Sequence, residues 1–429
     1  MRKLASMLLM LLIFAVPASA TDLPEIEAEA YILIEEQSGQ VLAGHNLDKV
    51  LYPASTTKIL TALVAVEHGD LDAVVTVGAE INRVPADGSK VHLQIGDQLT
   101  LRDLLWGMML RSGNDAAYTV AVHIARTAHD ATLTIQQAID VFAGMMNERA
   151  WEAGAGNSNF VVPDGYHHPQ HYTTAYDLAV ISRDALQHQL LRIMARAQEY
   201  VASYQSGGRQ VTARWRNTNQ LVQDESEWHY PQATGFKTGY TGEAEFCLVS
   251  SAADGGMSVL AVVLKGSREG RWHDSQALLT YGLENFCWHQ VCESGAVVSE
   301  IPVANQGRDQ APSVQVAGAR GRQMLLERSN LELIETELIL NPDLLVDTEA
   351  GPALRAPLRH GQMVGRVVYT LDGEVLVDSP LVTTAAVGGL PWWERNLAWI
   401  CIGGAALLWY LFYLPLVRRL NRRSRPVSR

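Results

Sequence analysis

The pattern of hydrophobic and polar positions divides the chain into regions of different secondary structure. Between about Glu25 and Phe286, strand-like runs such as AEAYILIEEQSGQVLA flank helical patterns such as LTLRDLLWGMML and TTAYDLAVISRDAL. Strands at both ends of a region that has helices between them predict an α+β fold, with an antiparallel sheet and a helical layer. We assign residues 25–288 to this domain.

A different pattern follows in the last third of the chain. The segments VVSEIPVAN, SVQVAG and MVGRVVYTLDGEVLVDSPLV alternate apolar and polar residues with a period of two, and Asp372-Gly373 is a hairpin turn signal. The pattern predicts a small, mostly β domain over residues 294–384. A short linker is expected at residues 385–396.

Both ends of the chain carry apolar runs of another kind. Residues 1–20, MRKLASMLLMLLIFAVPASA, combine a basic start, an apolar centre and an A-x-A site, which predicts a secretory signal peptide. Residues 397–417 contain no charged side chain and are long enough to cross a membrane. A buried core helix is the alternative, but tryptophans before the run and an arginine-rich tail at 418–429 favour a transmembrane helix with a cytoplasmic tail.

Charge and cysteine usage narrow the possible functions. Of the formal net charge of −12, six positive charges lie in the tail and two in the signal peptide, so residues 21–417 carry −20. An acidic body of this kind is a poor nucleic-acid binder. Among four cysteines, Cys287 and Cys292 could form a small disulfide or remain free thiols. We find no metal-ligand spacing, and the loop histidines His167, His168 and His171 have no carboxylate or cysteine partner nearby in sequence.

Candidate chemistry begins with PASTTKILTAL, in which Ser55 and Lys58 stand three residues apart at the start of an apolar helix. At this spacing the two side chains share one helix face, so a neutral lysine amine could take the proton of the serine hydroxyl. A capping serine and a solvent-exposed lysine are the alternative. The motif therefore needs support from elsewhere in the chain.

Two later patterns supply that support. The helix LTLRDLLWGMML ends at Ser112-Gly113-Asn114, which would hold a hydroxyl and an amide at a fixed corner between two helices. Further on, Lys237-Thr238-Gly239 lies in a strand-like segment. Each could be an ordinary turn or strand feature, but their joint occurrence in this order favours a serine active site.

With these motifs the chain resembles the low-molecular-mass penicillin-binding proteins, the D-alanyl-D-alanine carboxypeptidases. The similarity covers most of residues 27–384 and includes YPASTTKILTALVAVE, HYTTAYDLAVISRDAL, WRNTNQLV and TGFKTGYT. The resemblance implies a β-lactamase/transpeptidase-like fold and peptidoglycan stem peptides as substrate. It also implies β-lactam antibiotics as covalent inhibitors, no cofactor, and a place on the periplasmic side of a bacterial inner membrane.

The resemblance also assigns roles to residues. Ser55 would be the nucleophile and Lys58 its base, Ser112 would relay a proton, Lys237 would supply positive charge, and Asn114 would hold the peptide amide.

Four further residues would bind substrate. Gly239 would let the substrate backbone lie along the strand, and the backbone N–H groups of Ser55 and Tyr240 would form an oxyanion hole. Thr238 and Arg271 would bind the terminal carboxylate, a task that suits a planar guanidinium.

Two departures from the family pattern concern the turn after the Lys237-Thr238-Gly239 strand and the rim of the site. Glu245 stands where a glycine is usual, and Val162 and Tyr166 replace residues of an NPxGL-like segment. Two alternative functions remain open at this point: a DD-endopeptidase that cleaves peptidoglycan crosslinks, and a non-catalytic module that binds wall peptides or β-lactams.

Overall fold

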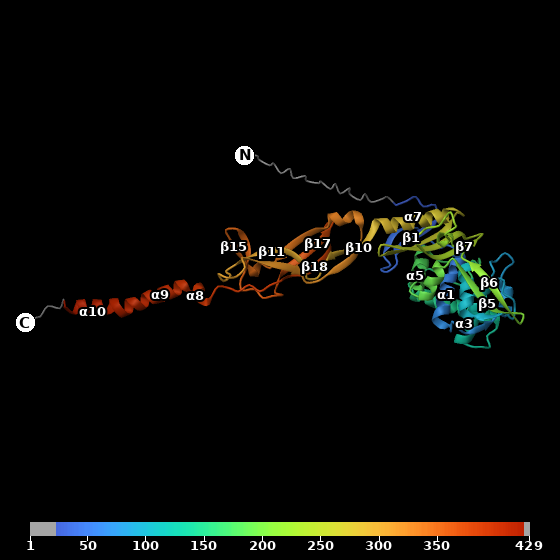
Figure 1. Cartoon of the computed structure of the whole chain (residues 1–429), viewed down its shortest axis with the longest axis horizontal. Helices are drawn as coiled ribbons and strands as arrows, with labels where there is room; N and C mark the ends of the chain where they lie inside the picture. Colours follow the sequence, from blue (N-terminus) through green and yellow to red (C-terminus); the bar gives the residue numbers. More distant parts are fainter. Residues whose placement is uncertain (1–22, 424–429) are drawn as a thin grey trace, which may run out of the picture. The chain divides into compact units, whose positions relative to one another are not determined.

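The computed structural model describes residues 23–423, so the predicted signal peptide and the last six residues lie outside the described part of the chain. The chain forms two compact units, and the boundary between them in the sequence lies between Cys287 and Trp288. Figure 1 shows both units, with labels on some of their helices and strands.

A five-stranded antiparallel sheet is the centre of the first unit. Its strand order is β2-β1-β9-β8-β7, and the strands are β1 (Ala30–Glu35), β2 (Val41–His45), β7 (Ala233–Thr241), β8 (Glu245–Asp254) and β9 (Met257–Gly266). The sheet is formed by both ends of the domain sequence with the helices in between, as the pattern predicted. The α+β expectation is confirmed.

Helices cover both faces of this sheet, which explains why β1 is buried along its whole length. Leu33 lies against Gly282 of α7 (Gly270–Asn285), whereas Ile32 and Ile34 belong to the core shared with the other helices. Those helices are α1 (Lys58–His68), α2 (Leu101–Arg111), α3 (Asn114–Ala128), α4 (Ile135–Glu152), α5 (Ala175–Ala185) and α6 (Gln189–Arg196). Figure 1 shows α7 on one side of the sheet and α1, α3 and α5 on the other.

Smaller elements complete the first unit. A four-stranded sheet has the order β3-β4-β5-β6 and consists of β3 (Val74–Thr76), β4 (Gln98–Thr100), β5 (Glu199–Ser206) and β6 (Arg209–Arg216). Three short 3-10 turns are η1 (Ala54–Thr57), η2 (Ala79–Arg83) and η3 (Gln220–Val222).

The second unit is rich in β-strands, as predicted. Seven strands form a sheet of order β14-β17-β18-β12-β11-β16-β15, and β10 (Phe286–Cys292) pairs with β13 (Arg322–Glu327). The seven are β11 (Val297–Ala304), β12 (Ser313–Gly318), β14 (Glu335–Leu340), β15 (Leu345–Thr348), β16 (Gly351–Arg355), β17 (Met363–Leu371) and β18 (Glu374–Thr383). Two short 3-10 turns, η4 (Arg328–Leu333) and η5 (Pro342–Leu344), lie between the strands.

The predicted hairpin turn lies between β17 and β18. Asp372 and Gly373 have φ values of +50° and +82°. A two-residue hairpin of type I′ requires positive φ at both positions, which explains the aspartate–glycine pair.

Residues of the expected linker pack onto the β domain in part. Val387 is only 2% exposed, and its backbone pairs with that of Leu358. Gly389 forms a bridge to Gln306. The segment up to Gly389 is thus attached to the β domain, because its backbone hydrogen bonds and one apolar side chain are used there.

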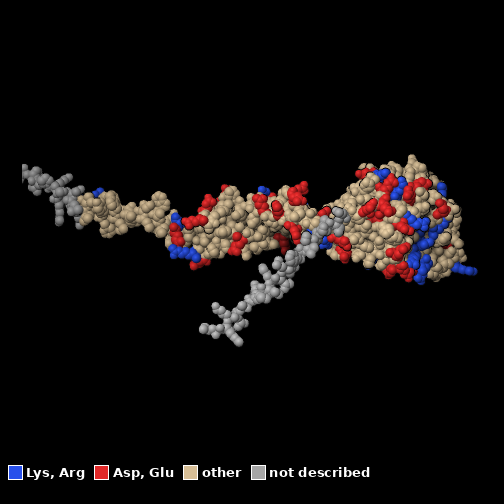
Figure 2. All heavy atoms as spheres, turned by 90° about the horizontal axis from the view of Figure 1, so that it is seen from above, with Lys and Arg blue, Asp and Glu red and all other residues tan. Residues whose placement is uncertain are grey.

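The C-terminal helical segment consists of α8 (Trp392–Arg395), α9 (Leu397–Leu408), a π-helical turn η6 (Trp409–Tyr413) and α10 (Leu414–Arg423). Leu397–Arg418 is the one stretch in the described residues that is long and apolar enough to cross a membrane, with a mean hydropathy of 2.0 and no burial against protein. In Figure 2 this helix has a surface almost free of charged side chains. These properties are consistent with a membrane anchor.

All four cysteines are free thiols in the structure. Of the two alternatives that the sequence left open for Cys287 and Cys292, the structure shows free thiols and not a disulfide. Within residues 23–423 no group of three or more histidine, cysteine or acidic side chains could hold a metal ion.

Candidate active site

Ser55 lies in η1, the 3-10 turn that directly precedes α1. The preceding residue, Ala54, has a φ of +49°, a left-handed conformation that costs a non-glycine residue about 1 kcal/mol. Gly165 lies against this turn, and a Cβ atom there would be 1.9 Å from the Ala54 carbonyl oxygen. The close approach of the Gly165 backbone therefore determines the position of the turn that carries Ser55.

The Lys58 amine is fully buried and has three oxygen partners. Its Nζ atom lies 2.9 Å from Ser55 Oγ, 2.7 Å from Asn114 Oδ1 and 2.5 Å from the carbonyl oxygen of Asp164. Burial lowers the pKa of Lys58 to about 8, against the opposing effect of the Asp164 and Asp115 carboxylates. The lowered pKa agrees with a lysine that can be neutral, and burial is its main cause.

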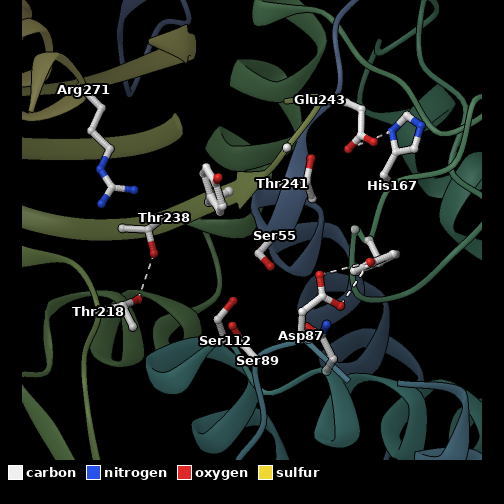
Figure 3. A pocket seen from close by; sticks show the side chains of 17 residues that line it. Ser55, Asp87, Ser89, Ser112, His167, Thr218, Thr238, Thr241, Glu243 and Arg271 are labelled. Carbon is white, nitrogen blue, oxygen red and sulfur yellow. Dashed lines mark hydrogen bonds and ion pairs between the residues drawn. The ribbon is translucent and has the colours of Figure 1, made fainter. Parts of the chain in front are cut away.

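The corner between α2 and α3 brings Ser112 and Asn114 to the same place. Ser112 ends α2 in a left-handed conformation, with φ 59° and ψ 32°. Its side chain lines the same cavity as Ser55 (Figure 3). Asn114 starts α3, and its backbone N–H donates to the carbonyl of Ser89.

Lys237 is buried on β7, where its Nζ donates to the Thr238 carbonyl at 2.9 Å. Burial lowers its pKa well below the ordinary value, and the charges of Lys58 and Arg271 add to this effect. Among the described residues its amine makes no hydrogen bond to Ser55 or Ser112, and it does not line the cavity. The structure brings Lys237 close to the site but not into its wall.

Strand β7 forms one side of the cavity through Thr238, Gly239 and Tyr240. A Cβ atom on Gly239 would lie 3.1 Å from the backbone nitrogen of Ser55, so a side chain there would crowd that N–H. Thr238 shares a hydrogen bond of 2.8 Å with the hydroxyl of Thr218. The Tyr240 side chain is 58% exposed and packs on Phe246.

Arg271 reaches the cavity from α7. Its guanidinium lies 4.8 Å from the ring centre of Phe246 and 4.4 Å from that of Trp272. Burial lowers its pKa to about 10, which still leaves it charged at neutral pH. Its Nε atom is buried without a hydrogen-bond partner.

The cavity has a volume of about 620 Å³, and its two ends differ in charge. Figure 3 shows Arg271 at one end and Asp87, His167 and Glu243 on the opposite side, with Ser55 between them. Asp87 accepts a hydrogen bond from the Tyr166 hydroxyl. An elongated ligand with one anionic end matches this arrangement.

Sequence reasoning gave no role to two buried residues beside the site. His171 is fully buried, with its Nε2 atom 2.8 Å from Thr57 Oγ1, and its Nδ1 accepts the backbone N–H of Val161. Its place at the start of the HYTTAYDLA segment was a signal, but three histidines in one loop are typical of either solvated or structural side chains. Asp164 gave no signal, because its burial depends on the packing of distant segments.

Comparison with known proteins agrees with this geometry. The family model for D-alanyl-D-alanine carboxypeptidase matches residues 17–268, and the model for the C-terminal domain of penicillin-binding protein 5 matches residues 286–388. The D-alanyl-D-alanine carboxypeptidase DacF of Bacillus subtilis is 29% identical over 89% of this chain and 93% of its own length. DacA of Escherichia coli is 30% identical over 84% of this chain and 83% of its own.

Solved structures give the same result. Penicillin-binding protein 5 from Haemophilus influenzae is 28% identical, with a TM-score of 0.58 over 85% of this chain and 98% of its own. A DD-transpeptidase variant from Streptomyces is 33% identical, with a TM-score of 0.57 over 61% of this chain and 99% of its own.

The fold and site are those of a serine DD-peptidase. The chain belongs to the D-alanyl-D-alanine carboxypeptidase family and is a serine-type D-Ala-D-Ala carboxypeptidase. Its C-terminal β domain is of the penicillin-binding protein 5 type. The resemblance inferred from the sequence motifs is thereby confirmed.

Proposed function

We propose that this enzyme is anchored in the bacterial inner membrane and removes the terminal D-alanine from peptidoglycan stem peptides through an acyl-enzyme on Ser55. The contact between the buried Lys58 amine and the Ser55 hydroxyl carries this proposal. A fully buried lysine whose pKa is near 8 can act as a proton acceptor near neutral pH.

The first half-reaction forms an ester. Ser55 Oγ attacks the carbonyl carbon between the two D-alanines, and its proton passes to the neutral Lys58 amine. The carbon–nitrogen bond then breaks, and Ser112 relays a proton to the departing amine of D-alanine. Water hydrolyses the ester in the second half-reaction and regenerates Ser55.

Other side chains orient the peptide and stabilise charge. The Oδ1 atom of Asn114 is used by Lys58, so its amide N–H group is the part left to hold the peptide. The positive charge of Lys237 would act on the site from within β7. The backbone N–H groups of Ser55 and Tyr240 would form the oxyanion hole, where loss of one donor typically lowers the rate by about 10²–10³.

The free carboxylate of the substrate would bind at the cationic end of the cavity. Arg271 and Thr238 are there, and a buried carboxylate needs both a cation and hydrogen bonds. The strand β7, with Gly239 beside Ser55, would pair with the extended peptide backbone. This arrangement favours a carboxypeptidase over the alternative DD-endopeptidase, whose substrate continues past the scissile bond.

The helix Leu397–Arg418 would anchor the protein, with residues 25–288 and the β domain at 294–384 on the periplasmic side. The predicted signal peptide and the arginines after the helix support this orientation.

Covalent labelling tests the central step. Penicillin contains a strained amide that can be attacked like the D-Ala-D-Ala carbonyl, so it should add to wild-type protein at Ser55. The mass increase should be absent in Ser55→Ala and should persist in Ser89→Ala, whose serine lines the same cavity. Peptide mapping by mass spectrometry gives the modified residue, and an adduct at any other residue would refute the assignment.

A further inference from the structure

A buried carboxylate without a full set of partners belongs to Asp164, whose backbone carbonyl oxygen contacts the Lys58 amine. Asp164 has no exposed surface, and its Oδ1 atom accepts the backbone N–H of Tyr166 at 3.1 Å. Its Oδ2 atom is buried and has no hydrogen-bond partner. An unpaired oxygen of this kind is costly in a protein interior, so it calls for an explanation.

The same residue holds the catalytic lysine through its backbone. The carbonyl oxygen of Asp164 accepts a hydrogen bond from Lys58 Nζ, and it is also 3.5 Å from Ser55 Oγ. The backbone of Asp164 thus holds the lysine amine. Because Asp164 does not line the cavity, its carboxylate has no access to the substrate.

The charges around Lys58 come from several elements. Asp115 of α3 is also buried, but its oxygens accept backbone N–H groups of Val91 and Leu93. Lys237 of β7 is a second buried amine. Two amines therefore share this region with one carboxylate that is fixed by a loop and one, Asp164, that has an unused oxygen. Burial raises the pKa of the Asp164 carboxyl, whereas the charge of Lys58 and the backbone N–H of Tyr166 favour its ionised form.

The remaining titratable groups nearby are neutral near pH 7. Burial lowers the pKa of His171 to about 3, and its Nδ1 already accepts a hydrogen bond. Burial raises the pKa of Tyr118, which also faces Asp164. Neither group can serve as the counter-charge to Lys58.

We propose that Asp164 is a positioning residue whose buried carboxylate is the counter-charge that raises the pH at which Lys58 loses its proton, against the opposing effect of burial. A negative charge close to an amine favours the protonated form. Asp164 thus keeps the Lys58 amine basic enough to take the Ser55 proton. Burial has the opposite effect on Lys58, so a fraction of this amine is neutral near pH 7. The inference rests on the proposed acyl-enzyme mechanism.

The test is the pH profile of acylation by penicillin, measured on the full chain by mass spectrometry of quenched samples. In wild type the rate should rise with pH through about 8, as Lys58 loses its proton. In Asp164→Asn the lost negative charge should move the midpoint to lower pH by about one unit. The variant should then be faster on the acid limb by up to about tenfold. Its alkaline plateau should be lower, because a less basic amine is a weaker proton acceptor.

Three further variants keep the test decisive. Asp164→Glu retains the charge and should return the midpoint toward that of wild type. If Asp164→Asn does not fold, Asp164→Ser is smaller, also uncharged, and should show the same acid shift. Asp87→Asn removes an exposed carboxylate at the cavity rim and should leave the midpoint unchanged.

The outcomes separate this inference from the proposed function. A folded Asp164→Asn variant whose rate falls equally at all pH values, with an unchanged midpoint, would show a purely structural role and overturn the inference. Absence of any Ser55 adduct in wild type would instead overturn the proposed mechanism.

Discussion

At the scale of single residues, the sequence predicted contacts that depend on local spacing. Ser55 and Lys58 do form a direct contact of 2.9 Å, because three residues of helical backbone fix their separation. The partners of Lys58 outside its own helix, Asn114 and the Asp164 carbonyl, lie 56 and 106 positions away. Tertiary packing sets such contacts, so the sequence could not show that Asp164 belongs to the site.

The proposed binding of the substrate carboxylate by Arg271 leads to a prediction at this scale. Hydrogen bonds to charged groups contribute about 1.5–3 kcal/mol, so Arg271→Ala should lower kcat/KM on a free-acid D-Ala-D-Ala peptide by about 10–100-fold. A C-terminally amidated peptide should already be a poor substrate for wild type, and the mutation should affect it much less. Steady-state hydrolysis of both peptides measures the effect.

A neighbouring arginine supplies the control. Arg268 also lies over Phe246, at 5.7 Å from the ring centre, but it does not line the Ser55 cavity. Arg268→Ala should therefore keep nearly full activity on the free-acid peptide. An equal loss on both peptides in Arg271→Ala would argue against a carboxylate role, and efficient cleavage of the amide by wild type would favour the endopeptidase.

At the scale of elements, the site depends on how the loop of residues 159–173 packs against the start of α1. The strand, helix and corner that carry the three motifs were predictable, since each has a local sequence pattern. The loop has no helical or strand periodicity from which its packing could be predicted. It supplies Gly165 beside Ala54 and His171 beside Thr57, and both contacts hold the turn that presents Ser55.

The His171 contact predicts a pH-dependent stability. His171→Ala would leave the Thr57 hydroxyl and the Val161 N–H with a lost partner inside the core, so it should destabilise the first unit by about 3 kcal/mol at pH 7. In wild type the pKa of His171 is about 3, well below that of an unfolded chain. The unfolded state therefore binds the extra proton between pH 6.5 and 3, and the stabilisation falls as pH drops through this window.

Thermal unfolding at several pH values measures this difference. The gap in Tm between wild type and His171→Ala should be largest near neutral pH and should narrow toward pH 4. His168→Ala, a change at an exposed histidine of the same loop, should leave Tm nearly unchanged. A gap that stays constant down to pH 4 would mean that His171 is not held neutral.

At the scale of the whole molecule, the sequence predicted the order of a catalytic domain, a β domain and an apolar helix, because each has its own periodicity. It predicted the C-terminal boundary of the β domain less well. The sequence AAVGGLP predicted a short flexible linker. In the structure, however, Val387 is buried among the apolar side chains of the β domain, and the backbone N–H of Leu390 donates to the backbone carbonyl of Asn305. Small residues and glycines gave no sign of this attachment, which consists largely of backbone hydrogen bonds.

This attachment decides where the anchor can be removed. A chain that ends after Pro391 keeps every β-domain contact of residues 385–390 and loses only the helical segment, which contributes no group to the cavity. It should be soluble, should no longer sediment with membranes, and should hydrolyse a short D-Ala-D-Ala peptide at the full-length rate.

A chain that ends after Ala386 removes Val387 from the β-domain core, and burying that side chain contributes about 1.5–3 kcal/mol to stability. Its catalytic rate should be unchanged, but the β domain should unfold at a lower temperature in calorimetry. A folded chain ending at Pro391 that is inactive on the soluble peptide would show that the helix serves catalysis, and equal unfolding temperatures for the two truncated chains would show that residues 387–391 add no stability.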